Sequence, residues 1–288
     1  RSTLSSSSPA SDVYKRQGRV FDIISGLLGQ GAPDLMCAAG FSDSPHFMYS
    51  GYDQKGDWYQ LYQIGFGGIP GRPFGDGPDG HSLWPSFTNV PNEFLESYFP
   101  LRIEIYETIT NSGGAGYHRG GNGVRVGYRF LEPGEISVHD DRWLTYPWGV
   151  NGGNPGARSK KILVKSDGSE QLVPSKCDRV KVMHGDLLLF ETWGGGGWGD
   201  PLTREVERVG SDVKKGLVSV SGALNYGVIT DSDGVVAIKE TQELRQEMNV
   251  ARGGIELFDK GGSIEELKAQ CLAETGFNPP IAPSFAPH

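Results

Sequence analysis

The sequence predicts an α+β fold, in which a β-rich central region of antiparallel strands is flanked by helices and followed by C-terminal helices. Three observations lead to this prediction. Apolar and polar residues alternate in short runs between residues 101 and 195, and a helical spacing replaces the alternation after Pro201. Glycine accounts for 43 of the 288 residues without a Gly-X-Y period. This indicates many tight turns and excludes a collagen-like chain.

Composition narrows the classes of function. Lys and Arg number 27 against 35 Asp and Glu, a net charge of −8, which argues against a general affinity for nucleic acid. No apolar run approaches the roughly 18 residues that span a membrane. The three cysteines, Cys37, Cys177 and Cys271, are far apart and form no CxxC. We therefore expect no disulfide framework and a reducing, cytoplasmic location.

The first 100 residues divide into a leader and a mixed segment. Residues 1–17 lack a hydrophobic period and resemble translated cloning sequence, so we expect a non-native leader and a native part that begins inside a longer gene; a natural disordered leader is the alternative. Residues 18–100 contain a helical spacing at 18–30, a hairpin around Gln54-Lys55-Gly56, and a glycine- and proline-rich loop at 69–91. Three aromatic residues favour an ordered, packed loop: Phe74, Trp84 and Phe87.

Residues 101–200 form the predicted β-rich region. Leu101–Thr108 alternates cleanly between apolar and polar residues, as a half-buried strand does. The pair Asp167-Gly168 predicts a hairpin turn. Further strands are expected at 124–131, 135–139, 161–165, 170–173, 179–183 and 187–192.

Residues 201–275 form the predicted helical C-terminal region. Three valines at helical spacing indicate an amphipathic helix at 203–216, followed by a shorter helix at 220–225 and another that ends at Gly253. Ser263 and Glu266 have the spacing of a capping box, which predicts a last helix. Residues 276–288 are proline-rich and indicate a tail.

Two of four candidate functional clusters contain glycine runs. Residues 111–123 connect two strands, and their N–H groups could hold an anion together with the guanidinium of Arg119. The spacing alone favours a wide β connection, and Arg119 could instead pair with a carboxylate such as Glu93. Residues 194–201 could present a helix N-terminus to an anion, but a hinge or close backbone packing is the favoured interpretation.

The other two clusters carry titratable side chains. In the segment His139-Asp140-Asp141-Arg142, an imidazole beside two carboxylates suits acid–base chemistry or a metal, although neighbours on a strand point to opposite faces. A buried Asp140–Arg142 pair that positions a turn accounts for the segment equally well. The fourth cluster consists of His81, Asn89, Asn92 and Glu93. Its glutamate can be a general base or the N-terminal charge of a short helix at 91–99.

Taken in order, these motifs resemble the C-terminal half of the B-type subunit of the hydantoinase B/oxoprolinase family. Relatives there include N-methylhydantoinase B, 5-oxoprolinase, and subunits of acetone and acetophenone carboxylases. The resemblance extends from about residue 18 to about residue 234. The matching positions are Asn89, Glu93, Pro100, 112–116, 119–121, Gly123, Asp141, Arg142, 147–149, Gly152, Gly153, Pro155, Gly156, 194–197 and 199–201.

The resemblance implies an ATP-dependent enzyme with two kinds of subunit. ATP is bound by a hydantoinase A-type subunit, which phosphorylates a carbonyl oxygen or bicarbonate, and the B-type subunit then hydrolyses a cyclic amide or carboxylates a ketone. We expect the hydrolase, in a hetero-oligomer. A carboxylase subunit, or a non-catalytic module that packs against other subunits, is the alternative. The family's metal ligands lie in an N-terminal half that this chain lacks, so we expect no tightly bound metal and no activity from this chain alone.

The motifs and the resemblance together give the candidate site residues. The candidate catalytic residues are Glu93, Arg119, Asp141 and Arg142. The candidate substrate-binding residues are Asn89, Gly113, Gly114, His118 and His139. No residue of this chain is expected to ligate a metal.

Overall fold

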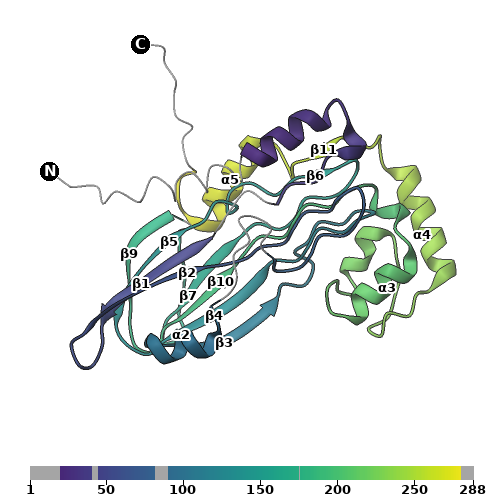
Figure 1. The fold of residues 1–288 in the computed structure, drawn as a ribbon. Helices are drawn as coiled ribbons and strands as arrows, with labels where there is room; N and C mark the ends of the chain where they lie inside the picture. Colours follow the sequence, from purple (N-terminus) through teal and green to yellow (C-terminus); the bar gives the residue numbers. More distant parts are fainter. Residues whose placement is uncertain (1–19, 41–44, 82–89, 175, 280–288) are drawn as a thin grey trace, which may run out of the picture.

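The computed structural model describes residues 20–40, 45–81, 90–174 and 176–279. Two antiparallel sheets stack face to face (Figure 1). The first sheet has the order β2 (Trp58–Ile64), β1 (His46–Tyr52), β5 (Gly134–His139) and β9 (Lys176–Val182). The second has the order β3 (Leu101–Thr108), β4 (Val124–Phe130), β10 (Leu187–Glu191), β7 (Lys160–Val164) and β8 (Glu170–Leu172).

Aromatic side chains from both sheets fill the space between them. The ring of Phe47 in β1 lies 4.7 Å from that of Tyr128 in β4 and 5.8 Å from that of Phe190 in β10. Tyr49 contacts Phe130 in the same way, at 4.7 Å. All five side chains are buried. The apolar surface that they remove from water is a main source of stability for this sandwich.

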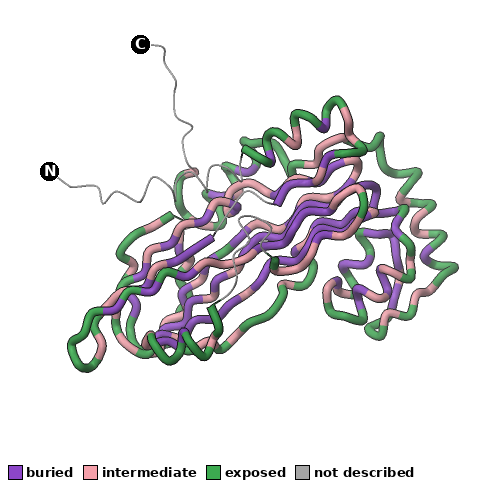
Figure 2. Tube along the Cα trace, viewed as in Figure 1, coloured by how far each residue is buried: buried purple, intermediate pink, exposed green. Residues whose placement is uncertain are grey.

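A bundle of extended, buried, glycine-rich segments continues from the sandwich (Figure 2). Residues 67–71, 112–123, 147–157 and 193–199 lie side by side and exchange backbone hydrogen bonds, for example from Gly121 N to Ile69 O at 2.7 Å and from Gly195 N to Gly121 O at 2.8 Å. A methyl group on Gly68 would overlap the carbonyl oxygen of Gly121. Much of the glycine excess therefore serves close backbone packing and not only the tight turns that we expected.

Helices lie at both ends of this bundle. Helices α3 (Val206–Lys214) and α4 (Ile238–Ala251) lie at the end away from the sandwich (Figure 1). Helix α5 (Ile264–Thr275) begins with the expected capping box, in which Ser263 and Glu266 exchange hydrogen bonds. A helix over residues 20–29 lies beside the short ladder of β6 (Gly149–Val150) and β11 (Phe258–Asp259). The remaining elements are α2 (Asn92–Tyr98) and three 3₁₀ turns at Pro33–Leu35, Pro201–Thr203 and Gly222–Tyr226.

The structure confirms the α+β class and its antiparallel strands. The hairpin around Gln54-Lys55-Gly56 joins β1 and β2, and Asp167-Gly168 forms the turn between β7 and β8. The short helix expected at 220–225 is a 3₁₀ turn. Because β1 pairs with β5, the first hairpin shares a sheet with the β-rich region. The domain boundaries themselves stay a prediction.

One expectation about the long loop was wrong. Phe74 is 90% exposed, because Arg72 and Gly75 pair across a tight turn and leave this side chain at its tip. Trp84 and Phe87 lie outside the described residues, as do the leader 1–17 and most of the tail. In the part of the chain that the structure covers, no helix has the length and apolar character needed to cross a membrane.

Candidate functional site

The glycine-rich connection at 111–123 lies inside the bundle, where its N–H groups are already used. Gly113 N donates to Asn122 Oδ1, and Gly114 N donates to the Gly195 carbonyl oxygen, each at 2.8 Å. Every N–H group from residue 117 to residue 123 also donates to an oxygen of the protein, and so does each from 194 to 199. An anion would therefore have to displace existing hydrogen bonds, and the geometry favours packed connections at both glycine runs.

Arg119 is buried within this connection, with 4% of its side chain exposed. Its guanidinium donates to both carboxylate oxygens of Asp79, at 2.8 Å from Nη1 and 3.2 Å from Nη2. Asp212 Oδ2 lies 3.8 Å from its Nε. The structural alternative for this arginine is thus realised, but its carboxylates are Asp79 and Asp212 where we had suggested Glu93.

A network of buried charges lies beside Arg119. Arg204 donates to both oxygens of Asp76, at 2.7 and 2.8 Å, and to Asp212 at 2.8 Å. Arg208 adds a further hydrogen bond to Asp76 at 2.8 Å. Burial alone would raise the pKa of Asp76, but the two arginines hold that pKa well below its usual range. Burial lowers the pKa of His118, whose Nδ1 lies 3.6 Å from Asp76, so the neutral imidazole is favoured.

The sequence did not identify most of this network. Two of its aspartates lie in the loop Gly75-Asp-Gly-Pro-Asp-Gly80, where acidic residues between glycines are the available signal. Their partners lie 40 to 132 positions further along the chain. Pairings over such separations leave no local pattern, so they emerge only when the segments pack together.

The side chains of residues 139–142 separate where β5 ends. Asp140 is buried and paired with Lys161 of β7. Arg142 donates to Asp22 at 2.5 Å and lies over the ring of Trp148. The expected Asp140–Arg142 pair was therefore wrong, because each side chain turns toward a different segment that packs over it.

The remaining candidates are spread over the sandwich. His139 is 43% exposed at its side chain and stacks on His46 with ring centroids 5.0 Å apart. Asp141 Oδ1 lies 2.5 Å from Lys176 Nζ. Glu93 is exposed in the first turn of α2, as expected for an N-terminal charge. Asn89 lies outside the described residues. The catalytic and substrate-binding roles of all these candidates stay predictions.

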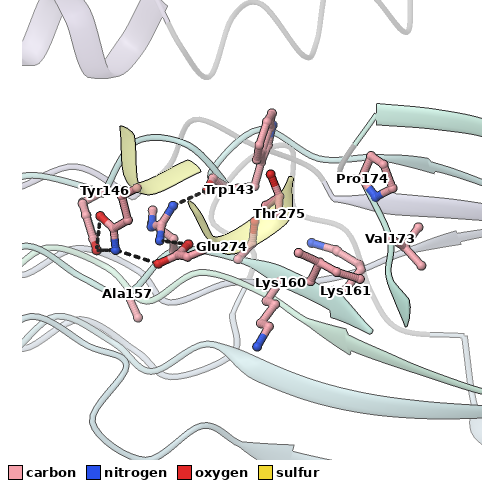
Figure 3. A pocket seen from close by; sticks show the side chains of 13 residues that line it. Trp143, Tyr146, Ala157, Lys160, Lys161, Val173, Pro174, Glu274 and Thr275 are labelled. Atoms are coloured by element: carbon pink, nitrogen blue, oxygen red, sulfur yellow. Dashed lines mark hydrogen bonds and ion pairs between the residues drawn. The ribbon is translucent and has the colours of Figure 1, made fainter. Parts of the chain in front are cut away.

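A cleft of about 490 Å³ lies between β7 and α5, close to the segment that follows β5 (Figure 3). Arg158 lies in it and donates from Nη1 to the Trp143 carbonyl oxygen at 2.9 Å and from Nη2 to Glu274 at 2.5 Å. Lys161 forms part of its lining. Our sequence analysis did not select this site, although the basic run Arg158-Ser-Lys-Lys161 is a signal for it.

No metal site is evident in these clusters. Among the residues described, no group of three or more His, Cys, Asp or Glu side chains could hold a metal ion. The residues present therefore do not fit the metal centre that the family resemblance implies elsewhere in the subunit. That this chain binds no metal tightly stays a prediction.

A sandwich extended by a glycine bundle is the architecture of a family of enzyme subunits. The family model described as hydantoinase B/oxoprolinase matches residues 1–201. The chain therefore belongs to the hydantoinase B/oxoprolinase family, as its motifs indicated.

Individual relatives refine this assignment. The B-type protein of the "Putative D-/L-hydantoinase" of Pseudomonas sp. (strain NS671) is 33% identical over 232 residues, 79% of this chain and 38% of that protein. The crystal structure of the ATP-dependent caprolactamase from Pseudomonas jessenii matches with a TM-score of 0.63 at 26% identity, over 76% of this chain and 40% of that chain. A nucleotide-free acetone carboxylase structure matches with the same TM-score of 0.63 at 20% identity, over 86% of this chain and 38% of that chain, and shows the fold alone. This chain thus spans 38% to 40% of the length of these proteins.

Proposed function

We propose that this chain is part of the B-type subunit of an ATP-dependent hydrolase of cyclic amides, which acts with a hydantoinase A-type subunit that binds ATP. The observation that carries the proposal is the likeness to the caprolactamase structure at 26% identity, together with the family match. A small cyclic amide is the proposed substrate, and a cytoplasmic hetero-oligomer is the proposed assembly. The corresponding likeness to acetone carboxylase, at 20% identity, supports the fold only.

The chemistry explains why two subunits would be needed. An amide carbon is a poor electrophile, and ATP supplies a phosphate leaving group on the carbonyl oxygen. What remains is to position the substrate and stabilise the charge that develops as the C–N bond breaks. In this proposal the bundle supplies rigidity. Its hydrogen bonds and the buried pair of Arg119 with Asp79 fix the connections from which neighbouring groups reach the substrate.

The test uses the whole B-type subunit that carries this sequence, purified with its A-type partner. The complex is supplied with ATP and either 5-oxoproline, hydantoin or caprolactam, and ring-opened product and ADP are measured together. A parallel assay follows labelled bicarbonate into acetone and acetophenone. We expect ring opening that requires ATP and both subunits, without fixed label.

Two outcomes would replace this proposal. Fixation of label in place of ring opening would assign the carboxylase alternative. An intact complex in which removal of this chain's region leaves the rate of ring opening unchanged would assign a packing module.

A further inference from the structure

We propose that the cleft between β7 and α5 binds a small organic carboxylate with an apolar body, and that Glu274 occupies the carboxylate position when no ligand is bound. The proposal concerns binding and does not depend on the hydrolase assignment. The cleft is open to solvent along one side and has the size, charge and lining that such a ligand requires.

The charge of the cleft favours an anion. Arg158, Lys160 and Lys161 line it, and Glu274 is the acidic residue among its lining. Lys161 is neutralised by Asp140 in a fully buried pair, and Arg158 is paired with Glu274. Lys160 is exposed and leaves the cleft with a net positive charge. A positive site with one removable carboxylate attracts a second carboxylate.

A buried polar group in the lining lacks a partner. Ser159 is 5% exposed, and among the described atoms its Oγ makes no hydrogen bond. A buried hydroxyl without a partner costs free energy, which a ligand oxygen recovers by accepting its proton. The adjacent guanidinium of Arg158 provides a charged donor for the same ligand.

The remaining lining is apolar and suits a carbon skeleton. Trp143, Tyr146, Leu172, Val173 and Pro174 contribute to it. The guanidinium carbon of Arg158 lies 5.0 Å from the centre of the Tyr146 ring, which fixes the plane of its donors. A flat or compact apolar body can therefore pack against aromatic walls while its carboxylate faces Arg158.

Glu274 shows how a carboxylate sits in this site. Its Oε2 accepts from Arg158 Nη2 at 2.5 Å, and its Oε1 accepts from Gln270 at 2.7 Å (Figure 3). Its side chain is 45% exposed, so it can turn into water at little cost when a ligand takes its place. The exchange keeps the guanidinium of Arg158 paired in both states.

Binding of benzoate to the full chain, measured by isothermal titration calorimetry against neutral benzamide, tests the proposal. We expect saturable binding of benzoate and none of benzamide. Arg158→Gln should weaken benzoate binding at least tenfold, and Ser159→Ala should weaken it severalfold. Glu274→Gln removes the competing charge and should strengthen binding several times. Glu265→Gln, an exposed change in the first turn of α5, is the matched control. Circular dichroism establishes that each variant is folded.

The sign of the Glu274 effect separates this proposal from a merely structural ion pair. If Arg158 and Glu274 only fasten α5, Glu274→Gln will leave benzoate binding unchanged or weaken it, and the proposal fails. Equal binding of benzoate and benzamide would show an apolar site without carboxylate recognition, which also overturns it. So would the absence of saturable binding of both benzoate and cyclohexanecarboxylate up to about 10 mM, where affinity is negligible.

Discussion

Arg119 is a buried charge whose hydrogen bonds are nearly all made within the chain. Its two hydrogen bonds to Asp79 and one to Gly120 O connect the bundle to the loop around residues 76–80. Removing a partner from such a pair leaves an uncompensated buried charge. The structure therefore favours a clamp at this position, which was the structural alternative that we kept open from the sequence.

Replacing Arg119 by lysine tests this clamp. Lysine keeps the charge but loses the planar fork that reaches both oxygens of Asp79. We expect the free energy of unfolding in urea to fall by about 2 kcal/mol or more. Arg102→Lys, an exposed change in β3, is the control and should shift it by less than about 0.5 kcal/mol. In the assembled enzyme, loss of ring opening at unchanged stability would contradict the clamp and restore the catalytic role for Arg119.

His118 should make stability depend on pH. Its pKa is lowered from 6.5 by burial, which outweighs the nearby carboxylate of Asp76. The unfolded chain therefore binds more protons than the folded chain between the folded pKa and about 6.5, so stability falls as the pH falls through that window. Asp76, whose pKa is lowered, loses its stabilisation at still lower pH.

Urea unfolding at about pH 5 and about pH 7.5 measures this dependence. We expect His118→Gln to reduce the loss of stability between the two pH values. His184→Gln, at an exposed position, is the control. An unchanged pH dependence in the His118 variant would show that other groups cause it.

At the scale of elements, the glycine bundle was the least predictable part. Alternation predicted the strands well because one face of each sheet is buried, and the capping residues predicted α5. The glycine runs were correctly located but admitted two interpretations. A run such as 194–197 carries no side chains that name its neighbours, so the sequence cannot say that residues 69, 121 and 154 lie against it. The same limitation applies to ion pairs such as Arg142 with Asp22, 120 positions apart.

The bundle predicts a strong dependence on single methyl groups. An alanine side chain at Gly195 would overlap the carbonyl oxygen of Ile69, whereas one at Gly253 would meet nothing within 4 Å. Both substitutions restrict the unfolded chain equally, so the difference between them isolates the overlap. We expect Gly195→Ala to cost about 3 kcal/mol in urea unfolding and Gly253→Ala to change stability by less than about 0.5 kcal/mol. Similar effects of the two would mean that the segments are not closely packed.

At the scale of the whole molecule, the helix over residues 20–29 is the main uncovered apolar surface near the N-terminal side of the described chain. Six of its side chains are 49% to 69% exposed: Val20, Phe21, Ile23, Ile24, Leu27 and Leu28. A patch of this kind favours association with another surface. On the proposed function, the remainder of a B-type subunit or its partner would cover it. The isolated chain would instead cover it by self-association.

Light scattering and sedimentation of the isolated chain test this final expectation. We expect oligomers whose fraction rises with protein concentration. The double variant Ile24→Lys with Leu28→Lys should lower that fraction severalfold, because two charges cannot be buried in an apolar contact without a large desolvation cost. Ile238→Lys with Val250→Lys places the same two charges on exposed apolar positions of α4 and is the matched control. Equal effects of the two pairs would assign the change to net charge alone. A chain that stays monomeric at all concentrations would show that this face does not drive association. In a complex with the longer subunit and its partner, the helix variant should weaken assembly while the α4 variant leaves it intact, since only the first alters the surface that needs a cover.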